Sequence, residues 1–134
     1  MGYTHYFEPP TFTDETWVEF CRQVRGICIV AESLDIMLAW CVDEDGDTDP
    51  DFGGYIDVNG VEEESCENLF IRRTDNRWSF CKTRRRPYDA AVVAILTAGK
   101  KMGLIDWSSD GLRGEHEDGI ALYILASQKE FPQN

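Results

Sequence analysis

The sequence has no Lys or Arg between Gly26 and Ile71, although this span carries thirteen Asp and Glu residues. The chain of 134 residues has a formal net charge of -12. A charge of this sign repels nucleic acid and anionic membranes, so we expect no direct binding to either. The basic residues gather instead in one segment: seven of the thirteen Lys and Arg residues lie between residues 72 and 86, where Asp75 is the only acidic residue.

The sequence also lacks long apolar runs and a secretory signal. No stretch approaches the roughly 18 consecutive apolar residues that a membrane-spanning helix needs. The first ten residues lack a basic region followed by an apolar run, which a secretory signal requires. We therefore expect a single domain over residues 1–134 that is located in the cytoplasm, or in the host cytoplasm if a bacteriophage encodes it.

The five cysteines form no Cys-x-x-Cys pair, and their number is odd. Both features argue against a disulfide framework and against a structural zinc site. Cys21 and Cys28 are seven residues apart, on one face of a predicted helix. We expect free thiols in the core, and we predict no metal and no cofactor.

The segment from Asp43 to Asp51 places a carboxylate at every second position, as a calcium-binding loop does. A loop of that kind needs Gly at its sixth position and Glu at its twelfth. Counted from Asp43, these positions hold Thr48 and Gly54. The segment is therefore predicted to be an exposed acidic loop without calcium.

Apolar residues at spacings of three and four predict two main helices. The first begins after Thr13 and ends near residues 31–33. The second begins at Pro87, a residue favoured at the first helical position, and ends before Gly103. The apolar run from Ile120 to Ser127 favours a further helix.

Short runs of β-branched and aromatic residues predict strands. They cover residues 2–7, 36–42, 55–59, 69–72, 78–82 and 104–107. Asn59-Gly60 is a favoured hairpin dipeptide, and Thr74-Asp75-Asn76-Arg77 has the composition of a second hairpin turn. The predicted fold class is α+β, with an antiparallel sheet of about four or five strands packed against two main helices.

The most informative segment is Phe80 to Asp89, because it places Lys82, Thr83 and three arginines directly before a predicted helix. The unpaired N–H groups and the dipole at a helix N-terminus attract anions. We expect a phosphate or carboxylate site here, with Thr83 as an additional donor. The alternative is that the arginines only pair with the acidic half of the chain.

Acid–base chemistry near neutral pH would depend on His5 or His116, the only two histidines, or on carboxylates with shifted pKa values. The sequence has no nucleophile elbow, phosphate loop or dinucleotide motif. A hydrolase that uses His5 with Asp89 or Asp110 remains an alternative, but no residue pattern identifies a nucleophile.

Several motifs together resemble an uncharacterised family of small bacterial and bacteriophage proteins. They are the opening Met-Gly-Tyr-Thr-His-Tyr-Phe, then Phe80-Cys-Lys-Thr followed by Arg86-Pro-Tyr-Asp, and finally Ser108-Ser-Asp-Gly. The resemblance covers nearly the whole chain, but the acidic loop departs from it. It implies no established activity. It does imply that the first strand is coupled to the segment 82–89.

The leading hypothesis is a binding protein, not an enzyme, for a small anionic molecule that is nucleotide-like. A bacteriophage protein that sequesters a nucleotide immune signal would be one setting. Tyrosines would stack a base, and Lys or Arg side chains would hold phosphate. A second hypothesis is an acidic inhibitor that engages a basic, nucleic-acid-binding protein partner. The expected ligand-binding residues are Tyr3, His5, Tyr6, Lys82, Thr83, Arg85, Arg86, Tyr88, Asp89 and Asp110.

Overall fold

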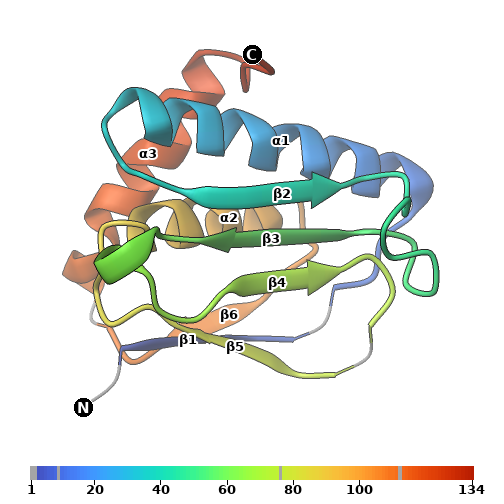
Figure 1. Ribbon diagram of the computed structural model, residues 1–134, viewed down its shortest axis with the longest axis horizontal. Coiled ribbons are helices and arrows are strands. Elements are labelled where there is room, and N and C mark those ends of the chain that lie inside the picture. Colours follow the sequence, from blue (N-terminus) through green and yellow to red (C-terminus); the bar gives the residue numbers. More distant parts are fainter. Residues whose placement is uncertain (1–2, 9, 76, 112) are drawn as a thin grey trace.

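The computed structural model describes residues 3–8, 10–75, 77–111 and 113–134. Over these residues the chain forms three α-helices and two three-stranded antiparallel sheets (Figure 1). The first sheet has the order β5-β1-β6, from Ser79–Lys82, Thr4–Phe7 and Trp107–Ser109. The second has the order β2-β3-β4, from Ala39–Asp43, Tyr55–Asn59 and Leu69–Arg72. The helices are α1 Asp14–Ser33, α2 Asp89–Lys101 and α3 Glu117–Gln128, and two short 3-10 helices cover Glu62–Glu64 and Arg113–His116.

The predicted α+β class is confirmed, and the predicted helices are present. α1 begins with a capping box, in which the Thr13 hydroxyl accepts from the Thr16 N–H and the Thr16 hydroxyl accepts from the Thr13 N–H. α2 begins at Asp89, two residues after the predicted start, because Pro87 forms a turn before the helix. Gly103, at a φ of 74°, follows its last turn. The predicted sheet of about four or five strands with two main helices is approximate, since six strands form two three-stranded sheets and the further helix favoured at residues 120–127 is present as α3.

The tight hairpin turn predicted at Asn59-Gly60 is absent. β3 and β4 pair with each other, but the connection between them spans residues 60–68 and contains a 3-10 helix. The Asn59 side chain holds this connection together, because its amide donates to the Cys66 carbonyl and its oxygen accepts from the Gly60 and Cys66 N–H groups. Gly60 is required for space, since a Cβ atom there would meet the Glu64 carbonyl oxygen.

The second predicted hairpin is also wrong, because its two strands belong to different sheets. β4 pairs with β3, whereas β5 pairs with β1, with Phe80 opposite Tyr6. The connecting segment therefore crosses from one sheet to the other. Two residues of these predictions, Asn76 in the turn and Gly2 in the first strand, lie outside the described residues.

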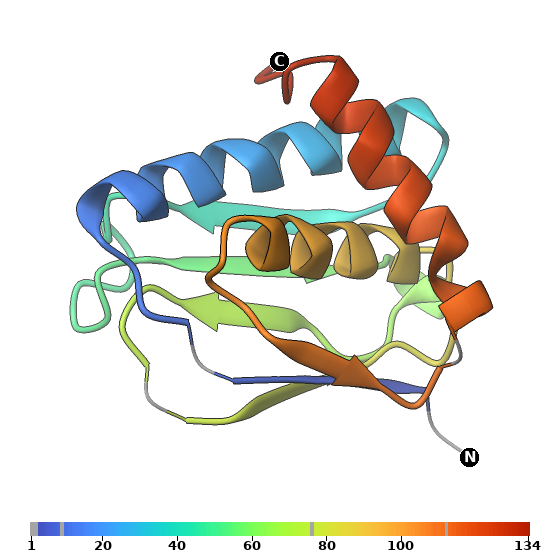
Figure 2. The ribbon, with the colours of Figure 1, turned by 180° about the vertical axis from the view of Figure 1, so that it is seen from behind.

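The helices lie on one side of the sheets, and the core fills the space between them (Figure 2). Cys21 and Cys28 of α1 are fully buried in this core, as their spacing predicts. Burial, followed by the nearby charge of Glu44, raises the pKa of the Cys21 thiol to about 12. Within the part of the chain that the structure describes, no helix has both the length and the apolar character to span a membrane.

The acidic segment is less exposed than predicted at its start. Asp43 is buried, and its carboxylate accepts from the backbone N–H groups of Asp47, Thr48 and Asp49 at 2.9 to 3.1 Å. Desolvation opposes the charged form, but these donors outweigh it and lower the pKa of Asp43. Asp43 therefore fixes the backbone of the loop through these hydrogen bonds.

Candidate functional site

The basic segment forms a strained turn between β5 and α2. The Arg86 N–H donates to the Thr83 carbonyl at 3.0 Å, and the two residues between them, Arg84 and Arg85, have φ values of 54° and 58°. Positive φ at both central positions is typical of type I′ turns, which favour Asn and Gly. Each non-glycine residue with a positive φ of this kind lowers the stability of the fold by about 1–2 kcal/mol. Backbone strain of this kind collects at functional sites, so the turn marks a candidate site.

Asp89, the first residue of α2, connects this turn to β1. Its Oδ1 atom accepts from His5 Nε2 at 2.6 Å and from the Thr83 hydroxyl at 2.7 Å. His5 and Thr83 are fully buried, and the Asp89 side chain is 13% exposed. Two buried donors thus fix the carboxylate at the start of the helix. Of the two acids expected beside His5, the structure brings Asp89 to it.

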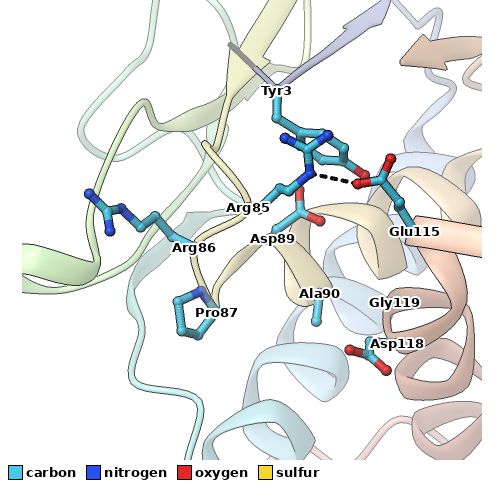
Figure 3. A pocket seen from close by; sticks show the side chains of 9 residues that line it. All are labelled: Tyr3, Arg85, Arg86, Pro87, Asp89, Ala90, Glu115, Asp118 and Gly119. Atoms are coloured by element: carbon cyan, nitrogen blue, oxygen red, sulfur yellow. Dashed lines mark hydrogen bonds and ion pairs between the residues drawn. The ribbon is translucent and has the colours of Figure 1, made fainter. Parts of the chain in front are cut away.

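Tyr3 and Arg85 cover the other side of this carboxylate (Figure 3). The Arg85 guanidinium lies over the Tyr3 ring at 4.3 Å, and its Nε donates to Glu115 Oε2 at 2.5 Å. Burial, followed by the charge of Asp89, raises the pKa of Tyr3 to about 12. The Tyr3 hydroxyl is therefore neutral at physiological pH.

A cavity of about 280 Å³, here called the turn cavity, opens beside this cluster. It lies between the turn, the start of α2 and the start of α3. Its lining mixes charges of both signs, and Figure 3 shows the Arg86 side chain extending away from Asp89. The described residues that line it include no Ser, Thr or Cys, so the hydrolase alternative finds no nucleophile of these three kinds there. The lining residues are Tyr3, Arg85, Arg86, Pro87, Asp89, Ala90, Glu115, Asp118 and Gly119.

The basic segment divides into paired and unpaired cations. Four arginines form ion pairs, namely Arg72 with Asp49 and Asp75, Arg73 with Asp14, Arg77 with Asp75, and Arg85 with Glu115. The side chains of Lys82, Arg84 and Arg86 make no ion pair or hydrogen bond with any residue that the structure describes. Of these partners only Asp49 belongs to the acidic half, residues 26–71, so the alternative that the arginines pair with that half holds at Arg72 alone. The other pairs use carboxylates elsewhere in the chain, and three cations are left over.

Lys82 does not reach the cluster around His5. In the pairing of β1 with β5, His5 lies opposite Cys81 and Thr4 lies opposite Lys82. Because neighbouring side chains alternate between the two faces of a strand, Lys82 points to the face away from His5. Tyr6 also lies on that outer face, 39% exposed, and its hydroxyl donates to Asp110 at 3.4 Å. Lys82, Tyr6 and Asp110, all predicted ligand-binding residues, are therefore separate from the turn cavity.

Two further roles need correction. Tyr88 is fully buried, and its hydroxyl donates to the Glu67 carbonyl at 2.6 Å. Its ring therefore packs in the core and cannot stack a base. Thr83 is fully buried as well, and its hydroxyl proton is used on Asp89, so it is not a spare donor for phosphate.

His116, identified from the sequence only as a possible acid–base residue, lies beside His5 in the structure. The His116 ring lies 5.8 Å from the His5 ring and 5.1 Å from the Trp107 ring, centroid to centroid. Burial, followed by the charge of His5, lowers the pKa of His116. His5 Nδ1 and His116 Nε2 are buried without a hydrogen-bond partner among the described residues. The sequence contains no spacing that relates residue 5 to residue 116. The only signal was that the chain has just two histidines.

Comparisons with protein families, with curated proteins and with solved structures find no match to this chain. The resemblance to a bacteriophage family therefore stays a prediction. Within the described ranges, no group of three or more His, Cys, Asp and Glu residues is arranged to hold a metal ion.

Proposed function

We propose that this chain binds a small anionic molecule at the turn cavity, with Arg86, which lines the cavity, as the main cation. Arg84 lies in the same turn but is not one of the lining residues, so it would add only longer-range attraction. The observation that carries the proposal is that both arginines lack an ion pair among the described residues, in a chain with 25 Asp and Glu residues. Of the two, only Arg84 has a positive φ, which is unfavourable for arginine; the other residue at positive φ, Arg85, pairs with Glu115. A strained turn that carries unpaired arginines favours a binding role over a purely structural one.

The start of α2 adds to the attraction for an anion. Tyr88 caps the helix without a side-chain hydrogen bond, and the Asp89 and Ala90 N–H groups donate to the Arg86 and Pro87 carbonyls. The contribution of α2 is therefore the positive end of its dipole. Asp89 opposes an incoming anion, but the His5 and Thr83 donors already hold its Oδ1 atom. A planar guanidinium such as that of Arg86 binds phosphate or carboxylate through two parallel hydrogen bonds.

The size of the cavity narrows the class of ligand. A volume of about 280 Å³ lies below the range of roughly 300–1,000 Å³ that drug-sized ligands occupy. Arg85 covers the Tyr3 ring, and Tyr88 lies in the core. We therefore propose that the cavity takes a phosphate or carboxylate group, and that the base of any nucleotide-like ligand stays outside it. Sequestration of a nucleotide signal is one setting that this proposal allows.

A second candidate function is the acidic inhibitor of a basic protein partner. The carboxylates of Glu62, Glu63 and Glu64 are exposed, and they form no ion pair with the described residues. Charges of this kind would steer a basic partner, and the complex would weaken steeply with salt. Pulldown with a basic nucleic-acid-binding protein at low and high salt tests this candidate.

Calorimetric titration tests the anion site, using inorganic phosphate and a panel of mono-, di- and cyclic nucleotides. The test variant is Arg86→Gln, and the matched control is Arg77→Gln, because Arg77 is exposed and pairs only with Asp75. A charge-assisted hydrogen bond contributes about 1.5–3 kcal/mol, which corresponds to a loss of roughly tenfold or more in affinity.

We expect this loss in Arg86→Gln and a change of less than about twofold in the control. Equal weakening in both variants would indicate general electrostatic attraction and contradict the proposal. So would the absence of binding of any anion to the wild-type protein.

A further inference from the structure

A second and larger cavity of about 720 Å³ lies between the end of α2, β6 and the start of α3. We call it the α2–β6–α3 cavity. Figure 2 shows β6 below α2 and the chain continuing from β6 to the start of α3. Its volume lies in the range of small-molecule sites. It shares no lining residue with the turn cavity.

The cationic part of this cavity comes from the last turn of α2. Lys100 and Lys101 are exposed, line the cavity and form no ion pair with any described residue. Lysines here would complement the helix dipole in any protein. A ligand site needs further groups that face the same space.

Those groups come from β6 and from the segment before α3. Trp107 is half-buried, lines the cavity and makes no hydrogen bond through its indole N–H within the described residues. Ile120, 37% exposed, adds an apolar surface. The cavity therefore combines an aromatic and aliphatic wall with hydroxyl groups from Ser108 and Ser109.

His116 gives an independent indication of a ligand. It lines the cavity, and its Nε2 atom is buried without a partner among the described residues. A buried polar atom left unpaired costs about 1–3 kcal/mol and calls for an explanation. Because the Nε2 atom itself has almost no accessible surface, a ligand in the cavity could supply the missing hydrogen bond only after the imidazole ring turns toward it. The favourable interaction of the two lysines with the helix dipole does not explain the unpaired nitrogen of His116.

We propose that the α2–β6–α3 cavity binds a small aromatic anion. Its ring would pack against Trp107 and Ile120, and its carboxylate or phosphate group would lie at Lys100 and Lys101. The lining of the cavity suits such a ligand, because its apolar, aromatic side lies next to two cations without an ion pair among the described residues. This site is separate from the one in the proposed function and does not depend on it.

Proton–nitrogen NMR tests the proposal through the indole N–H signal of Trp107, assigned by loss of that signal in Trp107→Phe. The probes are phenyl phosphate and benzoate, with inorganic phosphate and benzyl alcohol as the two halves of the ligand. We expect both aromatic anions to shift the Trp107 signal, with dissociation constants on the order of 1 mM. Each half alone should bind at least about tenfold more weakly.

The variants separate a site from general attraction. Lys100→Gln combined with Lys101→Gln should weaken phenyl phosphate binding about tenfold or more. Lys129→Gln is the matched control, since Lys129 is an exposed lysine at the end of α3, and it should change affinity less than about twofold. Arg86→Gln should leave the Trp107 shift unchanged, which distinguishes this site from the turn cavity.

An unshifted Trp107 signal in the wild-type protein would overturn the proposal without any variant. Equal weakening in the double variant and in Lys129→Gln would overturn it as well. A loss of melting temperature in the double variant, with no ligand response in the wild type, would assign the two lysines to the helix dipole alone.

Discussion

Replacing Asp89 with Ala removes the carboxylate that joins the turn, β1 and α2. Its Oδ1 atom accepts hydrogen bonds of 2.6 Å from His5 and 2.7 Å from Thr83, and both donors are fully buried. Hydrogen bonds to a charged group contribute about 1.5–3 kcal/mol each, and the two donors would be left without a partner. We therefore expect a decrease of about 3–5 kcal/mol in the free energy of unfolding.

Urea unfolding, followed by circular dichroism, measures this decrease. Asp110→Ala is the matched control, because Asp110 is exposed and accepts one long hydrogen bond, of 3.4 Å, from Tyr6. The control should lose less than about 1 kcal/mol. A loss in Asp89→Ala no larger than in the control would refute the argument that this carboxylate anchors the turn.

Three further predictions concern the same region. Arg84→Gly should stabilise the protein by about 1 kcal/mol in urea unfolding, because glycine adopts its φ of 54° without strain, whereas Arg84→Ala should not. Gly111→Ala should destabilise by about 1–3 kcal/mol in the same assay, since a Cβ atom there would meet the Tyr3 ring. The pKa of Tyr3 is raised from 10.0 to about 12, so the folded state holds this proton more tightly than the unfolded state. The resulting stability is complete below pH 10 and is lost as the pH rises toward 12, and Tyr3→Phe should flatten this part of the pH–stability curve.

The helices could be predicted from the sequence because their signals are local. The Thr13 cap, the apolar spacing of α1 and the Gly103 stop all act within a few residues. The hairpins could not be predicted, since strand pairing is decided by distant partners. β1 pairs with β5 and β6, which lie far along the chain, and turn dipeptides carry no information about that choice.

The same distinction applies to the candidate site. The sequence placed a basic segment before α2, and the resemblance implied its coupling to the first strand, which pairs with β5 in the structure. The positive φ values of Arg84 and Arg85 were not predicted. The sequence did not reveal that Lys82 points to the face of the sheet away from His5, or that Tyr88 lies in the core. These outcomes follow from strand register and burial. The His116 ring beside His5 depends on α3 packing, which no local pattern encodes.

The NMR signal of the Arg86 side-chain Nε–H group tests the central claim most directly. In a titration of the wild-type protein with inorganic phosphate, we expect this signal and the backbone amides of residues 84–90 to shift together and to saturate. Arg86→Gln should abolish the saturable shift of these amides. Amide shifts that persist unchanged in Arg86→Gln, or an Arg86 signal that stays in place while phosphate acts elsewhere, would contradict the assignment of the turn as an anion site.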